Sequence, residues 1–354
     1  MDADFWLKAV IATAPVLTLL LVFDRLDVFN LISIRAIALL TAAGGLLAAL
    51  SFFANWRVMD GFPIGFGSYS RYVAPAIEEC LKALPIVALF AVNRLGFKLD
   101  AAIAGFAVGA GFSMVENGWY LREFGEANLS AWLVRGFGTA VMHGGATAIF
   151  AVIAHEMTER QAAAEATAYR LNLLLFLPGL AAAMMAHSAF NHFPNHSLAV
   201  MALTMCVVPV TLFLTLSRSE RATHEWLKDD HEVHRKALQD LREGRFAESE
   251  AGRKIRKLTE RFRGSRAEDA FAYVTLKTEL VLRAEELILA RQRDEEADVS
   301  EADRRKFEEL DAVKRRLGRP ALAAIGPYLG FSRNDMWEVG RLRARVKAAK
   351  TATS

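Results

Sequence analysis

Ionisable and amide side chains interrupt four otherwise apolar stretches of this 354-residue chain. In chain order they are Glu78-Glu79-x-x-Lys82, Glu116-Asn117, Arg135 with His143, and His187-x-x-x-Asn191. A carboxylate can take a proton from water, and imidazole or amide groups can donate hydrogen bonds to an oxyanion. His and Glu together are also the ligand set of a catalytic zinc ion. These residue types suit acid–base chemistry, with or without a metal ion.

The stretches that carry these residues are long enough to cross a lipid bilayer. A hydrocarbon core of roughly 30 Å requires about 20 helical residues. We therefore predict seven transmembrane spans: Phe5–Phe23, Leu31–Ala54, Tyr72–Val92, Ala101–Leu121, Leu129–Ala154, Leu171–Phe193 and Leu198–Leu216.

Charged residues divide the chain into two parts. Residues 1–218 contain 14 acidic and 13 basic residues, whereas residues 219–354 contain 26 and 30. The two parts are about 12% and about 41% charged, against roughly 25% in an average globular domain. This distribution excludes a single soluble domain. It predicts a transmembrane domain over residues 1–218 and a charged, helical cytoplasmic domain over residues 219–354.

The C-terminal part has apolar residues at helical spacing in two segments, Arg266–Glu296 and Glu301–Leu317. Gly318 followed by Pro320 is expected to end the second helix. Basic clusters in this part alternate with acidic residues, which favours solvated helix faces, and no nucleic-acid partner is expected. The predicted fold class is all-α: a polytopic membrane helix bundle of about seven transmembrane helices, followed by a helical soluble C-terminal domain.

Basic residues in the loops predict the orientation, because basic loops are retained on the cytoplasmic side. An N-terminus outside and a C-terminal domain in the cytoplasm give the better fit. The first span has only Lys8 near its start, so we expect it to be kept rather than cleaved as a signal peptide. On this topology Glu78, Glu116 and His187 all lie about 8–9 Å below the outer end of their spans. His143 is expected deeper, at about 21 Å counted from Leu129, or less if that helix begins near Trp132.

An ionisable group at the centre of a membrane helix costs about 2.5–3.5 kcal/mol, so such groups are usually functional or paired. The polar groups of the third to sixth spans are therefore expected to face one another in one interior site. Lys82 is placed to pair with Glu78 or Glu79, since residues three or four positions apart share a helix face.

Together, these motifs resemble the PrsW family of intramembrane proteases, a relative of the CAAX-prenyl-protease and bacteriocin-processing group. The resemblance covers roughly residues 70–195, with the motifs in the family's order on separate spans. It implies hydrolysis of a peptide bond within or beside a bacterial-type inner or plasma membrane. The substrate implied is a single-span membrane protein in the lipid bilayer, such as an anti-sigma factor.

The resemblance also implies roles for the individual residues. Glu78 is the expected general base, and Glu79 is expected to orient water or bind a metal. His187 and Asn191 are the expected oxyanion donors, while Glu116 stands where the relatives carry His. Lys82, Asn117 and Arg135 are supporting residues. The candidate zinc ligands are Glu79, Glu116, His143 and His187, and a metal-free glutamate protease remains the alternative.

Two other functions use the same buried residues. An ion- or proton-coupled transporter would need carboxylates inside the membrane. A non-catalytic signalling scaffold would need the polar cluster only to hold its helices together. Both remain open at the level of the sequence, as alternatives to the protease.

Overall fold

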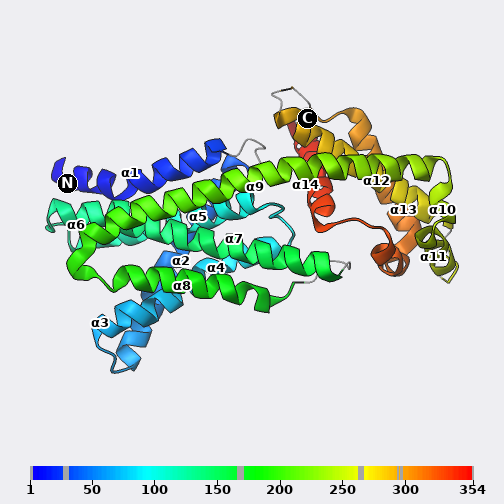
Figure 1. Ribbon diagram of the computed structural model, residues 1–354. Coiled ribbons are helices and arrows are strands. Elements are labelled where there is room, and N and C mark those ends of the chain that lie inside the picture. The colour runs from blue at the N-terminus through cyan, green and yellow to red at the C-terminus, as the bar shows by residue number, and fades with distance from the viewer. Residues whose placement is uncertain are drawn as a thin grey trace. The chain divides into compact units, whose positions relative to one another are not determined.

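The computed structural model describes residues 3–26, 32–165, 171–261, 267–292, 295 and 298–352. These residues are almost entirely helical and contain no strand, which confirms the predicted all-α class (Figure 1). By packing, the chain divides into two compact units. The first comprises residues 1–159 and 171–220, and the second comprises residues 160–170 and 221–354.

The first unit is built from long helices joined by short turns. They are α1 (Ala3–Leu26), α2 (Ile34–Gly61), α3 (Phe66–Ser68), the π-helix η1 (Tyr69–Val73), α4 (Ala74–Ala91), α5 (Lys98–Glu123), α6 (Leu129–Leu133), the π-helix η2 (Val134–Thr139), α7 (Ala140–Glu165), η3 (Leu173–Phe176), α8 (Leu177–Asn191), η4 (Pro194–His196) and α9 (Ser197–Arg242).

Six helical segments in the described part of the chain are long and apolar enough to cross a membrane. They are Ala3–Phe23, Ile34–Gly61, Lys98–Glu123, Leu129–Ala162, Leu173–Asn191 and Pro194–Thr215. The seventh predicted span, Tyr72–Val92, forms η1 and α4 instead of one uniform apolar helix. Three charged residues, Glu78, Glu79 and Lys82, make α4 less apolar than the six segments.

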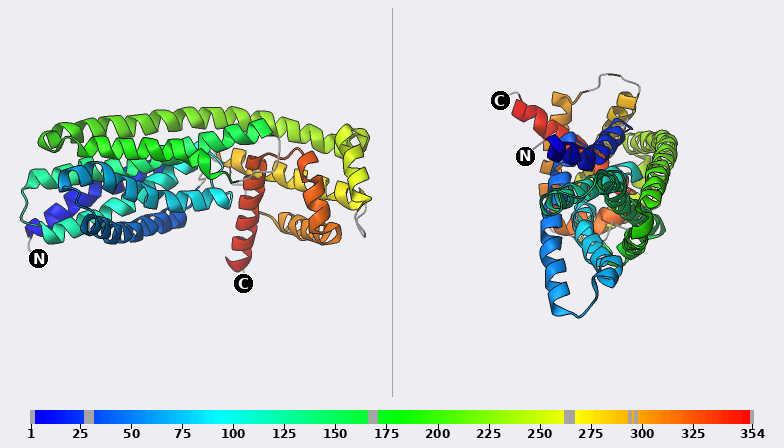
Figure 2. Two further views of the ribbon diagram at one scale, coloured as in Figure 1. Left: turned by 90° about the horizontal axis from the view of Figure 1, so that it is seen from below. Right: turned by 90° about the vertical axis from the view of Figure 1, so that its left-hand side faces the viewer.

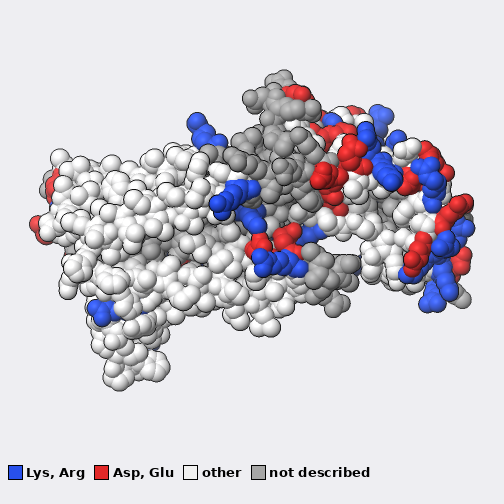
Figure 3. Space-filling view, viewed as in Figure 1, with Lys and Arg blue, Asp and Glu red and all other residues white. Residues whose placement is uncertain are grey.

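The outward faces of these helices are apolar. On α2, Leu39, Leu46 and Phe53 recur every seven residues and are 72%, 70% and 58% exposed. Figure 3 shows few Lys, Arg, Asp or Glu side chains on the visible face of the first unit. Soluble proteins rarely expose contiguous apolar surface of this kind. A membrane location follows.

The helix α5 lies at the centre of the first unit, and α2 and α1 both pack against it (Figure 2). Its buried residues are mostly Ala and Gly, which allow close approach between backbones. A Cβ atom on Gly109 would overlap the carbonyl oxygen of His143, and one on Gly111 would overlap that of Thr41. These two glycines therefore set the spacing of α5 from α7 and from α2.

Replacing Gly109 by Ala is expected to destabilise the protein by about 1–3 kcal/mol, since the added methyl group forces α5 away from α7. The matched control is Gly118→Ala on the same helix, where a Cβ meets no neighbouring atom of the described residues. That change is expected to be neutral or stabilising, because Ala favours the helix by about 0.5–1 kcal/mol. Thermal unfolding in detergent measures both, and equal melting temperatures would contradict the prediction.

The second unit contains α10 (Arg245–Glu248), α11 (Glu250–Thr259), α12 (Ala267–Gln292), α13 (Glu301–Ile325), η5 (Gly326–Tyr328) and α14 (Arg333–Ala352), together with the end of α9. The helix α12 packs against α11, α13 and α14. It corresponds to the predicted segment Arg266–Glu296, of which Arg266 and several of the last residues lie outside the described ones. At Gly318 the backbone φ is 73°, so α13 breaks before Pro320, as predicted.

Candidate active site

Five elements of the first unit carry the candidate residues. These are α4 with Glu78, Glu79 and Lys82; α5 with Glu116 and Asn117; η2 with Arg135; α7 with His143; and α8 with His187 and Asn191.

The helix α4 turns two charged residues into the protein core. Ala83, Ile86 and Phe90 form a buried stripe on this helix, and Glu79 and Lys82 extend the stripe toward its N-terminal end. Glu79 is 2% exposed and Lys82 is fully buried. Buried charges are tolerated when they are paired, and Lys82 Nζ lies 2.5 Å from Glu79 Oε1.

The Lys82–Glu79 pair holds two imidazoles. Nδ1 of His187 lies 2.8 Å from Glu79 Oε1, and Nδ1 of His143 lies 2.9 Å from Lys82 Nζ. An ammonium group can only donate hydrogen bonds, so Nδ1 of His143 accepts. The two imidazole rings meet edge to face with their centroids 4.7 Å apart. Helices α4, α7 and α8 therefore meet in one buried polar cluster.

Glu116 lies on the opposite side of His143. Its Oε2 is 3.0 Å from Nε2 of His143, and its Oε1 is 3.3 Å from Nη2 of Arg135. Arg135 Nε donates to Asn117 Oδ1 at 2.8 Å, and Asn117 Nδ2 donates to the backbone oxygen of Ala12 at 2.9 Å. Arg135 and Asn117 thus hold Glu116 and His143 in a fixed arrangement.

Glu78 is the least engaged of the three carboxylates. Its side chain is 12% exposed, and its Oε2 lies 3.9 Å from Nε2 of His187. Asn55 Nδ2 donates to Glu78 Oε1 at 3.2 Å, and the Tyr69 hydroxyl donates to Asn55 Oδ1 at 2.7 Å. Oε1 of Glu78 is therefore held by the hydrogen bonds through Asn55 and Tyr69, and Oε2 faces the imidazole of His187.

The sequence analysis missed three residues that contact this cluster. Asn55 escaped notice because the second span was expected to end at Ala54, whereas α2 continues to Gly61. Tyr69 precedes the predicted third span, in η1. The centroid of the Phe112 ring lies 4.9 Å from Lys82 Nζ, one helical turn before Glu116 on α5. A polar residue within one helical turn of a span end is the signal that could have found Asn55.

Asn191 lies one turn beyond His187, and its contact is with the backbone of η1. Its Nδ2 donates to the carbonyl oxygen of Ser70 at 2.8 Å. Ser188 donates in the same way to the carbonyl oxygen of Arg71 at 2.6 Å. These two bonds join α8 to the π-helical turn that leads into α4, and so fix His187 relative to Glu78 and Glu79.

His143 lies beside Glu116 and His187, although its expected depth was greater than theirs. The apolar segment from Leu129 to Ala162 has 34 residues, which at 1.5 Å per residue is about 51 Å of helix. Since this exceeds the roughly 30 Å of a hydrocarbon core, Leu129 need not lie at the membrane surface. Counting depth from Leu129 therefore placed His143 too far from the other residues.

The donor atoms fit a divalent metal ion. Glu78, His143 and His187 each offer one ligand atom, and these atoms lie within 4.8 Å of one another. Two His and one Glu form a known catalytic zinc set. A carboxylate that orients the second ring nitrogen of a ligand His is typical of such sites, and Glu79 stands in that place at Nδ1 of His187. Of the predicted ligands, His143 and His187 belong to this group, whereas Glu79 and Glu116 do not, and Glu78, which was expected to be the general base, takes part instead.

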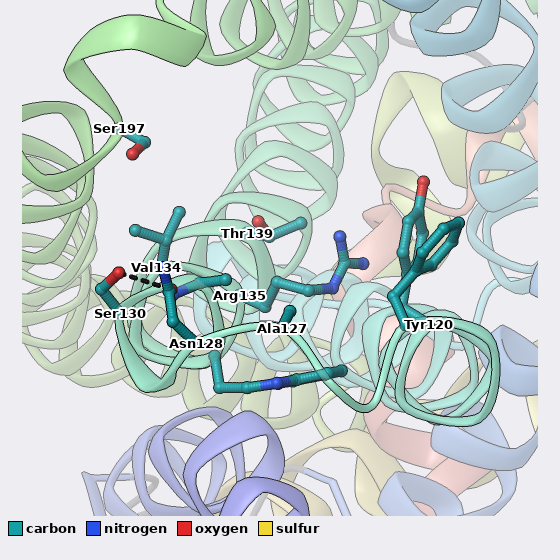
Figure 4. Close-up of a pocket in the computed structure, with 11 residues that line it drawn as sticks. Tyr120, Ala127, Asn128, Ser130, Val134, Arg135, Thr139 and Ser197 are labelled. Atoms are coloured by element: carbon teal, nitrogen blue, oxygen red, sulfur yellow. Dashed lines mark hydrogen bonds between the residues drawn. The ribbon is translucent and has the colours of Figure 1, made fainter.

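Two hollows adjoin the cluster. One is lined by residues around Arg135, whose guanidinium carbon lies 3.7 Å from the centroid of the Tyr120 ring, and by Asn128, Thr139 and Ser197 (Figure 4). The other is an open groove between α4 and α8. It is lined by Tyr72, Ala76, Met184, Met185, Ser188, Ala189, His192 and Phe193. The groove includes Ser188, which follows His187 on α8, and Ala76, two positions before Glu78 on α4.

Residues 33–216 match the family described as PrsW family intramembrane metalloprotease. This match spans more than half of the chain and includes the α4, α5, α7 and α8 residues described above. It confirms the predicted family and the predicted enzyme class, in preference to the transporter and the scaffold. Neither the curated proteins nor the solved structures contain a match to the chain.

Proposed function

The chain belongs to the PrsW family of intramembrane metalloproteases, and we propose that it cleaves a single-span membrane protein with the cluster around Glu78, His143 and His187. The observation that carries this proposal is the convergence of one carboxylate and two imidazoles from three helices in the interior of a membrane protein. An anti-sigma factor is the proposed substrate class.

Glu78, His143 and His187 would hold a zinc ion. Such an ion lowers the pKa of a bound water and polarises a carbonyl group. His187 offers Nε2, because its Nδ1 is engaged by Glu79. His143 contacts Lys82 at one ring nitrogen and Glu116 at the other. Ligation would require a free lone pair on this ring, so His143 would give up its contact with Lys82 at Nδ1, or shift its proton from Nε2 to Nδ1, in order to hold the ion.

Glu116 is the proposed general base. Its side chain is 15% exposed and lies beside His143, with Arg135 fixing one oxygen. It would take a proton from the attacking water and return it to the leaving amine, which completes the hydrolysis. The sequence analysis expected Glu78 in this role. The exchange follows from assigning Glu78 to the ion: Glu79 Oε1 is engaged by Lys82 and His187, Glu78 Oε2 lies opposite Nε2 of His187, and Glu116 is the carboxylate that remains for the base.

Asn191 is a positioning residue in this proposal rather than the predicted oxyanion donor, since its amide is tied to Ser70. The groove between α4 and α8 is the proposed docking surface for the substrate. Its Tyr72, Met184, Met185 and Phe193 are suited to an apolar transmembrane helix. A helix seated there would present its backbone near Glu78 and His187.

Removal of the metal is expected to abolish proteolysis. The experiment is cleavage of co-reconstituted single-span substrates in proteoliposomes, with and without a zinc chelator, followed by readdition of Zn²⁺. We expect at least about a 100-fold loss of rate with chelator and recovery with zinc. Cleavage that resists the chelator would instead support the metal-free glutamate mechanism.

The proposed orientation has the N-terminus outside and the C-terminal domain in the cytoplasm, following the basic residues of the loops. It requires η1 and α4 to cross the membrane in addition to the six apolar segments. A cytoplasm-dependent reporter fused after Ser354 is therefore expected to be active. A reporter active only on the outer side would reverse the topology. The same fusions at Gly61, the last residue of α2, and at Asn93, which follows α4, provide internal references.

A further inference from the structure

A second group of His and carboxylate side chains lies wholly within the second unit. Its members come from three helices that are distant in the sequence: Asp230, His231 and His234 on α9, Glu285 on α12, and Asp335 and Glu338 on α14. We refer to these six residues as the α9–α12–α14 cluster. Nothing in the proposed proteolysis uses them.

Glu285 is the centre of this cluster and is fully buried. Its Oε1 lies 2.6 Å from Nδ1 of His234, and its Oε2 lies 3.0 Å from Nδ1 of His231. On α12 it adjoins Val281, Ala284 and Ile288, which belong to the buried apolar side of the helix. A carboxylate at such a position is costly unless other groups compensate its charge.

Three carboxylates surround His234, whose side chain is 8% exposed. Besides its contact with Glu285, its Nε2 lies 3.6 Å from Asp335 Oδ2, and its Nδ1 lies 3.8 Å from Asp230 Oδ2. Asp230, His234, Glu285 and Asp335 each offer one ligand atom, and these atoms all lie within 4.8 Å of one another. Four potential ligands therefore converge on one point.

Glu338 adds an independent observation, because it is a fully buried carboxylate with no hydrogen bond. It is 0% exposed, and neither of its oxygens has a hydrogen-bond partner among the described residues. Oδ2 of Asp230 and Oδ1 of Asp335 are likewise without a hydrogen-bond partner. Leaving a buried acceptor unsatisfied costs about 1–3 kcal/mol, and more for a charged group. A bound cation would satisfy these oxygens.

Negative charge is crowded in this cluster, which holds four carboxylates and two imidazoles. An added cation at this position would relieve the repulsion between the acids.

Local sequence explains how each helix presents two ligands. Asp230 and His234 are four positions apart on α9, and Asp335 and Glu338 are three positions apart on α14, so each pair shares one helix face. Carboxylate and His ligands that project inward from several helices are a recurrent way to build a metal site in a helical bundle. The arrangement differs from a solvated acidic surface, since all six of its members are at least three-quarters buried.

We propose that the second unit binds a divalent transition-metal ion through Asp230, His234, Glu285 and Asp335. The mixture of imidazole and carboxylate favours Zn²⁺, Mn²⁺ or Fe²⁺, whereas Mg²⁺ and Ca²⁺ prefer oxygen ligands alone. Because the ligands come from α9, α12 and α14, the bound ion joins these three helices and stabilises the unit.

The test uses the full-length chain in detergent with the active-site ligand removed by His187→Ala, so that the two sites are counted separately. After dialysis against Zn²⁺ or Mn²⁺ and then metal-free buffer, bound metal is measured by mass spectrometry. We expect about one ion per chain in His187→Ala, and fewer than about 0.1 when Glu285→Gln is added. The matched control adds Glu286→Gln, an exposed neighbour on the same helix, and is expected to keep the ion.

Thermal unfolding gives a second readout. Zn²⁺ is expected to raise the melting temperature of His187→Ala and of the Glu286→Gln control, but not of the Glu285→Gln variant. Asp230→Asn, at a partly exposed position, is the second variant should Glu285→Gln fail to fold. Equal metal content in the Glu285→Gln and Glu286→Gln proteins would overturn the proposal. So would the absence of bound metal from His187→Ala, or full displacement of the ion by millimolar Mg²⁺.

The result is distinguishable from failure of the proposed protease site. A chain that loses metal only on His187→Ala holds its ion in the active site and not in the α9–α12–α14 cluster. A chain that loses metal only on Glu285→Gln holds it in the cluster alone.

Discussion

Substitution of Glu78 by Gln is expected to lower kcat/KM for cleavage of a single-span substrate by at least about 10³-fold and to remove zinc from the active site. Gln keeps the shape of Glu and the contact with Asn55 but lacks the negative charge. Glu78 Oε2 is the carboxylate oxygen that faces Nε2 of His187, so loss of its charge leaves two neutral imidazoles as ligands. Proteoliposome cleavage and metal content measured on the same preparation check both effects.

Two comparison variants separate the roles of the carboxylates. Glu116→Gln is expected to lose activity to a similar degree while retaining zinc, because it removes the proposed base and not a ligand. Glu123→Gln, at the exposed end of α5, makes the same chemical change away from the cluster and is expected to leave activity unchanged. Retention of zinc by Glu78→Gln together with loss of activity would instead make Glu78 the base, as the sequence analysis expected.

Substitution of Lys82 by Met is expected to destabilise the protein by about 3–5 kcal/mol, because it leaves the Glu79 carboxylate buried without its cation. Lys82 is fully buried, and its ammonium contacts Glu79, His143 and the Phe112 ring. The change also frees His143 to rotate, so activity is expected to fall with stability. Thermal unfolding in detergent measures the loss.

Lys98→Met is the matched control for this prediction. Lys98 pairs with Glu156, but the two side chains are 37% and 31% exposed, and such pairs contribute only about 0–1 kcal/mol. Adding Glu79→Gln to Lys82→Met is expected to recover part of the stability, since it removes the uncompensated charge. Equal losses for Lys82→Met and Lys98→Met would contradict the assignment of a buried ion pair to the site.

The two His and carboxylate clusters differ in how visible they are in the sequence. Each active-site motif lies inside an apolar stretch, where a charged residue is conspicuous. Asp230, Glu285 and Asp335 lie in a segment with many charged residues, and nothing local distinguishes them from acids on a solvated face. Only burial separates them, and it depends on the packing of α9, α12 and α14: Glu285 and Asp335 are buried, and Asp230 is largely buried.

Local spacing alone determined which residues share a helix face. Glu79 with Lys82, and His187 with Asn191, follow from the helical repeat, as does the break at Gly318. The membrane helices follow equally from the sequence, because each apolar segment is long enough to cross the bilayer. These features depend on residues within a few turns of one another, and so they are readable from the sequence.

The tertiary structure decided which of these faces meet. Whether Glu78 or Glu79 lies nearest to the open ring nitrogen of His187 depends on the rotation of α4 about its axis. The level of His143 depends on how far α7 is displaced along its neighbours, and the contact of Asn55 with Glu78 depends on the length of α2. A rotation of one residue changes the direction of a side chain by about 100° at 3.6 residues per turn. Such offsets are set by packing between helices, for example by the close approach at Gly109 and Gly111, and no spacing within one helix encodes them.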